Sequence, residues 1–254
     1  MSVFGEFAKY YDLVHQNKDY DKESSYVDSL IRKYRPQTRT ILDIGCGTGN
    51  YAFAMQQLGY EVTGVDSSAQ MIELAKEKLE GNNGETHAPS FYCGRMEEFK
   101  SPTKSGAIIC LFFSLCYQMT DDLIFQSLSR FKDQMEEDGV LIFDFWNKTG
   151  VLTEKPDVKI QKYNTRDLEI TKLVEPSLDT SMDYVGIDYT FYIENEKGGI
   201  SKFKEFHKVR YLCPKRLEKF LEKLNFELIL KEGWMTNQKL KRNEWSGIIV
   251  ARPK

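Results

Sequence analysis

The chain has 254 residues, of which 41% are hydrophobic and 29% are charged, so it can bury a large core and is not intrinsically disordered. A net charge of −3 with a pI near 5.8 argues against a general nucleic-acid-binding protein. The five cysteines have neither CxxC nor metal-ligand spacing, which indicates reduced thiols in a cytoplasmic protein without a metal site. We expect no membrane span, because the longest uncharged run, residues 105–120, is too short and too polar at its end.

The first part of the chain alternates predicted helices and strands. Apolar residues recur at helical spacing from Tyr26 to Tyr34, which predicts a helix over 20–35 that ends before Pro36. Strands are then predicted at 40–44, 61–65, 90–93, 107–112 and 140–145. Helices are predicted between them at 50–58, 67–79 and 121–135. This alternation over residues 40–146 is typical of a doubly wound α/β domain.

The pattern changes after Trp146. Segments 169–175, 182–194 and 200–212 alternate like strands and carry many charges, which indicates an inserted antiparallel sheet. A helix at 214–225 and strands at 227–231 and 247–251 would complete the first sheet. The predicted fold is therefore α/β, with a doubly wound, mostly parallel seven-stranded sheet and an inserted antiparallel subdomain. We assign residues 1–38 to an N-terminal helical lid, 39–150 and 213–254 to the core, and 151–212 to the insertion.

The run from Thr40 to Asn50 carries the most informative motif. An apolar strand reaches Asp43 and Ile44, glycines follow at positions 45, 47 and 49, and a helix is predicted to start at Asn50. A strand, a glycine turn and a helix together build a nucleotide-sized pocket at the carboxyl end of a parallel sheet. A dinucleotide site needs Gly-x-Gly-x-x-Gly, so that a pyrophosphate can bind the helix N-terminus. Here the third glycine, Gly49, comes one residue early, and Asn50 stands where the dinucleotide motif requires that glycine.

This motif, with Asp43 two residues before Gly45, resembles motif I of the class I S-adenosylmethionine-dependent methyltransferases. Asp66 follows the second predicted strand, where an acid can accept hydrogen bonds from both ribose hydroxyls. Such an acid suits NAD and S-adenosylmethionine alike, so a nicotinamide enzyme is the alternative. The resemblance implies S-adenosylmethionine as the cofactor, bound by Tyr11, Tyr20, Asp43, Gly45, Cys46, Gly47, Asp66, Ser67, Met71, Gly94, Arg95, Met96, Leu111 and Phe112.

The adenine contact departs from the family pattern at Arg95. Many relatives have an acid there to bind the adenine amino group, and an arginine cannot accept that hydrogen bond. The contact would then pass to Glu97 or to the backbone, and Arg95 would equally suit a surface position. Met71 is implied to pack on the adenine or ribose, or else to be an ordinary core residue.

The substrate side is similar to the nucleotide-sugar N-methyltransferases, which dimethylate the amino group of dTDP-linked deoxyamino sugars. The similarity lies in residues 11–20, which look like their N-terminal lid, in residues 112–117 and in His207-x-x-Arg210. It implies that Tyr11 and Tyr20 cover the cofactor. The substrate-binding residues that it implies are Phe113, Tyr117, Trp146, His207 and Arg210. The family tends to place histidine where Tyr117 stands, so the acceptor is less certain than the cofactor.

Tyr117 is the candidate catalytic residue. It could accept a hydrogen bond from an acceptor amine or pass its proton to water, or it could simply be a wall of the pocket. His207 and Arg210 are three residues apart and therefore lie on opposite faces of a regular strand. We favour Arg210 as the ligand of a substrate phosphate or carboxylate, because its planar guanidinium pairs with oxyanions through two hydrogen bonds. A surface ion pair is the alternative for this arginine.

Three functions are compatible with these residues. The first is N-methylation of a small amine, most simply that of an amino-sugar nucleotide, in which positioning supplies most of the acceleration. The second is methylation of a hydroxyl, a carboxyl or a non-sugar amine; an oxygen acceptor needs a firmer base, and the absence of a histidine near Tyr117 favours nitrogen. The third is a non-catalytic S-adenosylmethionine-binding subunit. The expected partner is a small-molecule acceptor rather than nucleic acid or membrane, and the chain could act as a homodimer.

Overall fold

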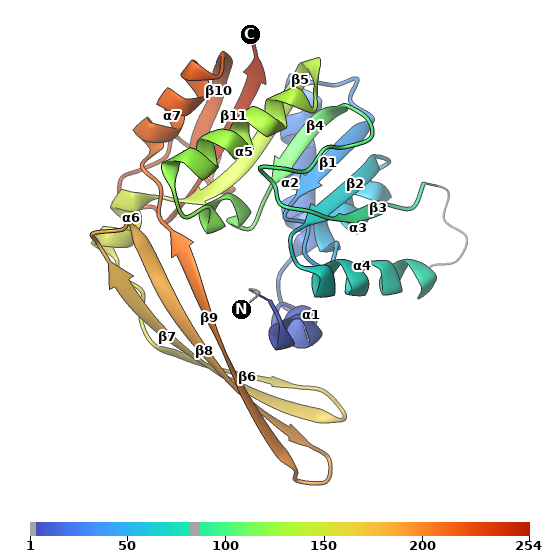
Figure 1. Cartoon of the computed structure of the whole chain (residues 1–254), viewed down its shortest axis with the longest axis vertical. Helices are drawn as coiled ribbons and strands as arrows, with labels where there is room; N and C mark the ends of the chain where they lie inside the picture. The colour runs from blue at the N-terminus through green and yellow to red at the C-terminus, as the bar shows by residue number, and fades with distance from the viewer. Residues whose placement is uncertain (1–3, 82–86) are drawn as a thin grey trace.

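The computed structural model describes residues 4–81 and 87–254, which form two separate sheets (Figure 1). The larger sheet has seven strands in the order β10-β11-β5-β4-β1-β2-β3. Its strands are β1 (Thr40–Ile44), β2 (Glu61–Asp66), β3 (Ser90–Cys93), β4 (Ser105–Cys110), β5 (Met135–Trp146), β10 (Phe226–Gly233) and β11 (Ser246–Pro253). Neighbouring strands pair in parallel except around β11, which runs antiparallel to both β5 and β10. The predicted mostly parallel seven-stranded sheet is confirmed.

Helices cover both faces of this sheet. They are α2 (Tyr20–Tyr34), α3 (Asn50–Gln57), α4 (Ala69–Gly81), α5 (Asp121–Asp133) and α7 (Pro214–Lys223), with the short α6 (Lys148–Thr153) after β5. The apolar side chains of α2 and α3 belong to one buried cluster, and those of α5 and α7 belong to another. The central strand β4 is buried along its whole length, because both clusters pack against it. A doubly wound core requires this arrangement.

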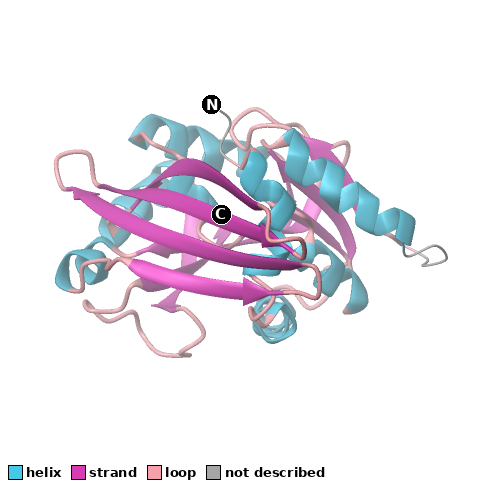
Figure 2. Ribbon diagram, turned by 90° about the horizontal axis from the view of Figure 1, so that it is seen from below, coloured by secondary structure: helices cyan, strands magenta, loops and turns pink. Residues whose placement is uncertain are grey.

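The second sheet is a four-stranded antiparallel layer inserted between β5 and α7. Its strands are β6 (Lys159–Asn164), β7 (Leu168–Asp179), β8 (Tyr184–Asn195) and β9 (Ile200–Arg210), paired in that order. Seen from below, its long strands cross the molecule as one curved layer (Figure 2). Two short helical segments, η1 (Glu6–Tyr10) and α1 (Tyr11–Val14), lie between the two sheets (Figure 1). Phe7 and Val14 pack there against Ile170, Phe191 and Ile193 of the inserted sheet.

Strand β4 ends two residues earlier than the apolar pattern predicts. Phe112 and Phe113, the first of which was expected inside this strand, have left-handed backbones with φ of 56° and 64°. The buried carboxylate of Asp144, on β5, accepts the N–H of Phe112 at 3.0 Å and that of Phe113 at 2.8 Å. These two charge-assisted bonds hold the backbone away from the sheet and aim it across the ends of the strands.

Three further expectations about the elements were wrong. Strand β5 begins at Met135 rather than at residue 140, and α5 ends at Asp133, two residues before the predicted end. No strand was predicted at 159–164, because β6 is an edge strand with only Tyr163 buried and shows no apolar alternation. None of the helices in the described ranges has the length and hydropathy needed to cross a bilayer.

Candidate active site

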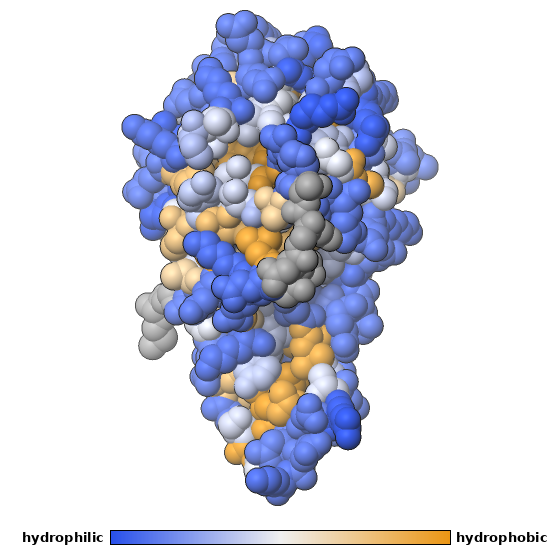
Figure 3. Space-filling view, turned by 90° about the vertical axis from the view of Figure 1, so that its right-hand side faces the viewer, coloured by the Kyte–Doolittle hydropathy of each residue, from blue (hydrophilic) through white to orange (hydrophobic). Residues whose placement is uncertain are grey.

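A cavity of about 440 Å³ lies where the carboxyl ends of the parallel strands meet the N-terminal segment and the inserted sheet. On the face shown in Figure 3, apolar surface gathers between the two parts of the molecule and continues onto the lower part, which the inserted sheet forms. The cavity thus has two halves. One is lined by the glycine turn and the ends of β1, β2 and β4, and the other by the inner face of β7, β8 and β9.

The glycine turn forms the floor of the first half, and its glycines have different tasks. Gly45, Gly47 and Gly49 all have positive φ, at 73°, 55° and 83°. A Cβ on Gly45 would lie 2.5 Å from Ser114, and one on Gly49 would lie 2.6 Å from the ring of Phe91. A Cβ on Gly47 would meet nothing within 4 Å. Gly45 and Gly49 are therefore required by packing, whereas Gly47 leaves the backbone open toward the cavity.

Asp66 ends β2 beside this turn. Its Oδ2 accepts the N–H of Gly47 at 3.0 Å, and its Oδ1 accepts the N–H of Ser68 at 2.8 Å. Burial raises the pKa of Asp66, although these backbone hydrogen bonds oppose the shift. Each carboxylate oxygen can accept more than one hydrogen bond, so the carboxylate can still bind a pair of hydroxyls in the cavity.

The structure brings most of the predicted cofactor residues to this half. Tyr11, Tyr20, Gly45, Cys46, Gly47, Asp66, Ser67, Met71, Gly94, Arg95, Met96, Leu111 and Phe112 all line the cavity. Arg95 Nε lies 2.6 Å from Glu97 Oε1, and Glu97 Oε2 accepts Gln118 Nε2 at 2.9 Å. Both oxygens of Glu97 have partners within the chain, but each can accept a further hydrogen bond, so Glu97 and the backbone of residues 94–96 are both available for the adenine contact.

Asp43 is the exception among these residues, because it lies behind the turn and does not line the cavity. Only 1% of its surface is exposed, and within the described structure its Oδ2 has no hydrogen-bond partner. Burial and the nearby charge of Asp66 raise the pKa of Asp43 to about 8. Asp43 lies between β2 and β4, opposite Gly64 and Ile109. From this position it can support the glycine turn but does not contact a ligand in the cavity.

The N-terminal segment is fastened to both sides of the cavity. On the side of the glycine turn, Asp12 accepts Thr48 Oγ1 at 2.6 Å and Asn50 Nδ2 at 2.9 Å, and it pairs with Lys78 Nζ at 2.7 Å. On the side of the inserted sheet, the N–H of Phe7 donates to Glu205 Oε1 at 3.1 Å. The segment spans the cavity and shields it from water, as a lid would.

His15 extends this segment over the cavity. Its Nδ1 donates to the carbonyl of Tyr11 at 2.8 Å, and its ring packs on Tyr11 and on the edge of Phe112. Burial lowers the pKa of His15 to about 4, so the imidazole is neutral near pH 7. The positive charges of Lys172 and Lys18 contribute to this lowering, and the hydrogen bond to the Tyr11 carbonyl opposes it.

Tyr117 and His207 meet in the second half, with Phe113 and Trp146 among the other lining residues. The hydroxyl of Tyr117 lies 2.9 Å from Nδ1 of His207, and Nε2 of His207 lies 3.0 Å from Glu205 Oε2. The expectation of no histidine near Tyr117 was wrong, since the sequence shows only near neighbours and these two residues are 90 positions apart. The surroundings of Tyr117 therefore do not favour a nitrogen acceptor over an oxygen acceptor.

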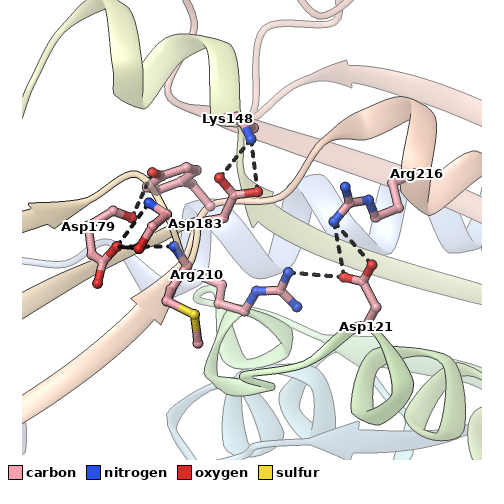
Figure 4. A network of polar contacts seen from close by, with 9 residues as sticks. Asp121, Lys148, Asp179, Asp183, Arg210 and Arg216 are labelled. Carbon is pink, nitrogen blue, oxygen red and sulfur yellow. Dashed lines mark hydrogen bonds and ion pairs between the residues drawn. The ribbon is translucent and has the colours of Figure 1, made fainter.

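Arg210 lies outside the cavity, contrary to the preference for it over His207. The two residues do lie on opposite faces of β9, and it is His207 that faces inward. Arg210 Nη2 pairs with Asp121 Oδ1 at 3.0 Å, at the N-terminus of α5 (Figure 4). Arg216 pairs with the same carboxylate, and Lys148 pairs with Asp183 at the β7–β8 turn. This network joins the inserted sheet to the core and leaves Arg210 a structural role.

Comparisons with known proteins agree on one class. Residues 41–139 match the family model described as a methyltransferase domain. A protein of Geobacillus sp. (strain WCH70) that bears the name methyltransferase is 28% identical over 212 residues, 81% of each chain. The dTDP-3-amino-3,6-dideoxy-alpha-D-glucopyranose N,N-dimethyltransferase of Streptomyces fradiae is 30% identical over 144 residues, 56% of this chain and 54% of that one. The sugar N-methyltransferase KedS8 from Streptoalloteichus sp. ATCC 53650 has the same fold, with a TM-score of 0.81 at 18% identity over 100% of this chain and 97% of that chain.

The chain carries a methyltransferase domain that uses S-adenosylmethionine. The first half of the cavity fits this cofactor. The open backbone at Gly47 admits a ligand at close range, Asp66 offers a carboxylate for hydroxyls, and Met71, Leu111 and Phe112 supply apolar surface. The methyltransferase matches, rather than the cavity, decide against the nicotinamide alternative.

Sequence reasoning missed several residues that line this methyltransferase cavity. They include Phe4, Phe7, His15, Thr48, Asn50, Tyr51, Val65, Ser114, Gln118, Lys172, Ile187, Tyr189 and Val209. Thr48 and Asn50 could have been found, because they follow the glycines directly. Lys172, Ile187 and Tyr189 could not, because they reach the cavity only through the register of the inserted sheet.

Proposed function

We propose that this methyltransferase transfers a methyl group to the amino group of a nucleotide-linked amino sugar. The observation that carries the proposal is the continuous cavity, which joins the glycine turn to a second half with one buried cation and a hydrogen-bonded phenol. The activity for which the Streptomyces fradiae relative is named supports this acceptor, and the match spans 54% of that relative. The fold shared with a sugar N-methyltransferase is consistent with it.

Lys172 supports an anionic acceptor. Lys172 is only 6% exposed, and its Nζ lies 4.7 Å from the ring centre of Tyr189 and 5.4 Å from that of Phe7. Among the residues at 4–81 and 87–254, no carboxylate pairs with this ammonium group, and burial alone lowers its pKa to about 8. A buried ammonium without a counterion is costly. A phosphate of a nucleotide-linked acceptor would supply the missing charge.

The residues of the first half would hold the cofactor. The backbone at Gly45–Gly47 and the carboxylate of Asp66 would bind its polar groups, while Met71 and Leu111 would pack on the adenosine. When bound, S-adenosylmethionine supplies a methyl group that its sulfonium already activates. The lid residues Tyr11 and Tyr20 exclude water from this half. The chain's main task is then to hold the acceptor's lone pair in line, which can supply much of the acceleration.

A hydroxyl acceptor is the second candidate, and the Tyr117–His207 hydrogen bond favours it. A neutral amine attacks without a strong base, whereas a hydroxyl gains from a base that removes its proton as the new bond forms. The pair of Tyr117 and His207 could serve either acceptor. The distinction therefore requires a direct comparison of two acceptors that differ in one group.

The test is a methyl-transfer assay with S-adenosylmethionine and four probes. They are dTDP-3-amino-3,6-dideoxyglucose, its 3-hydroxyl analogue dTDP-6-deoxyglucose, the free amino sugar without the nucleotide, and glycine. We expect methyl transfer to the first probe and at least tenfold less to the free sugar, because the free sugar lacks the phosphates. Faster transfer to dTDP-6-deoxyglucose would show that the acceptor group is a hydroxyl and not an amine. Transfer to none of the nucleotide sugars, with S-adenosylmethionine still bound in calorimetry, would contradict this acceptor class while leaving the methyltransferase assignment intact.

A further inference from the structure

Three ionisable side chains from two parts of the fold form one hydrogen-bonded chain that ends at the cavity. Tyr117 lies on the short helix η2 (Ser114–Tyr117) after β4, and His207 and Glu205 lie on the inner face of β9. The two heavy-atom distances are 2.9 Å and 3.0 Å, and His207 is 1% exposed. Hydrogen bonds from His207 and from the N–H of Phe7 outweigh burial and lower the pKa of Glu205, so it is a carboxylate.

The Glu205 carboxylate fixes the direction of its own hydrogen bond and thereby the tautomer of a neutral His207. An ionised carboxylate can only accept, so Nε2 of His207 carries the proton and donates to Glu205. In the neutral form of the imidazole this tautomer has a bare Nδ1, which can accept the hydrogen of the Tyr117 hydroxyl. The lone pairs of the phenol oxygen remain for a group in the cavity, since Tyr117 is one of the lining residues.

We propose that Tyr117, His207 and Glu205 form a proton relay in which Tyr117 removes a proton from the methyl acceptor and His207 stores it. The acceptor's N–H or O–H bond breaks, and its electron pair stays on the heteroatom that the methyl group joins. The released proton binds the Tyr117 oxygen while the Tyr117 hydrogen moves to Nδ1 of His207. The resulting imidazolium keeps its Nε2–H on the Glu205 carboxylate, which stabilises the positive charge. Tyr117 is the catalytic residue, and His207 and Glu205 act through it.

The same carboxylate connects the relay to the lid. Glu205 Oε1 accepts the N–H of Phe7, while Oε2 accepts Nε2 of His207. Phe4 and Tyr189 complete the enclosure, with their ring centres 4.7 Å and 5.0 Å from that of His207. The lid therefore helps to hold the carboxylate that sets the tautomer of His207, and it encloses the site of proton removal.

The first test reads the tautomer and needs no acceptor. The chain has three histidines, so long-range ¹H–¹⁵N correlation spectra of the full-length protein can be assigned with His15→Gln and His87→Gln. We expect a protonated Nε2 and a bare Nδ1 for His207. In Glu205→Gln, the N–H of Phe7 can only donate, so it holds the amide oxygen on its own side and turns the amide NH₂ toward Nε2. The tautomer should then invert, whereas Glu169→Gln, at a strand carboxylate paired with Lys162, should leave it unchanged.

The second test is kinetic and uses dTDP-3-amino-3,6-dideoxyglucose and dTDP-6-deoxyglucose as the acceptor probes. Tyr117→Phe, His207→Gln and Glu205→Gln should lower kcat by about 10²-fold or more with the hydroxyl probe, the usual range for a lost general base. Without the relay, hydroxide must remove the proton, so the residual rate should keep rising with pH where the wild-type rate levels off. A protonated Nδ1 in the wild-type protein, or an unchanged tautomer in Glu205→Gln, would overturn the relay even if methyl transfer is found. Failure of every acceptor probe would instead count against the proposed acceptor, on which only this kinetic test rests.

Discussion

The Tyr117 hydroxyl and Nδ1 of His207 form a 2.9 Å hydrogen bond that connects the core to the inserted sheet. The bond is partly buried, and His207 is only 1% exposed, so loss of the Tyr117 hydroxyl would leave a desolvated imidazole nitrogen. We expect Tyr117→Phe and His207→Leu to be coupled in a double-mutant cycle by about 1 kcal/mol, the usual net contribution of a neutral hydrogen bond. The measurement is the free energy of unfolding in urea for the wild type, the two single variants and the double variant.

A matched cycle shows whether the coupling belongs to this bond. Tyr192→Phe, at an exposed tyrosine of the same sheet, should add to His207→Leu without coupling. Strictly additive effects of Tyr117→Phe and His207→Leu would mean that the hydrogen bond contributes nothing to stability.

Gly45 and Gly47 should respond differently to the same substitution. In Gly45→Ala the Cβ meets Ser114 at 2.5 Å and the left-handed backbone is strained, so we expect a loss of several kcal/mol in the free energy of unfolding. Gly47→Ala has the backbone cost alone, about 1–2 kcal/mol, because its Cβ enters open space. That space is the cavity, so Gly47→Ala should instead weaken S-adenosylmethionine binding. Urea denaturation and calorimetry separate the two effects, and equal stability losses at both positions would contradict the division of roles.

Asp66 should contribute to cofactor affinity more than to the fold. Asp66→Asn removes the charge but keeps the size of the side chain, and we expect S-adenosylmethionine binding to weaken by about 1–3 kcal/mol, the range for hydrogen bonds to a charged group. Calorimetric titration measures the change, with Asp188→Asn on the exposed face of β8 as the control. Unchanged affinity in Asp66→Asn would show that Asp66 does not bind S-adenosylmethionine.

Local sequence patterns predicted the strands of the core well. The end of β4 and the residues of the inserted sheet that reach the cavity depend on contacts between distant parts of the chain. The bounds of β1 and β3 were predicted to the residue, because clear apolar runs end there at turn residues. The end of β4 was misjudged because Phe112 looks like a strand residue, whereas a carboxylate on β5 captures its N–H. Alternation along β9 gave the opposite faces of His207 and Arg210, but only the packing of the inserted sheet on the core decides which face meets the cavity.

Lys172 offers a test that separates function from stability. Lys172→Met replaces a buried cation by an apolar side chain of similar length, so we expect a higher free energy of unfolding at pH 7. The pKa of this lysine falls from 10.5 to about 8 on folding, so the destabilisation is absent above about pH 10.5, grows as pH falls from there toward about 8, and is complete below that. The same variant should raise the KM for dTDP-3-amino-3,6-dideoxyglucose at least tenfold. A more stable protein with an unchanged KM would show that Lys172 does not bind the acceptor.

Asp43 should make the stability of the protein depend on pH. Burial and Asp66 raise the pKa of Asp43 from its ordinary value of 3.8 to about 8. The folded chain therefore holds a proton that the unfolded chain releases, and the stability from this group is complete below about pH 4 and lost as pH rises through about 8. Asp43→Asn removes the titration, so its free energy of unfolding should fall less between pH 5 and pH 8.5 than that of the wild type. Part of the fall should remain in the variant, because burial also raises the pKa of Asp144 to about 7. Urea denaturation at several pH values measures both slopes, with Asp188→Asn as the exposed control, and equal slopes for wild type and Asp43→Asn would show that Asp43 is ionised in the folded protein throughout this range.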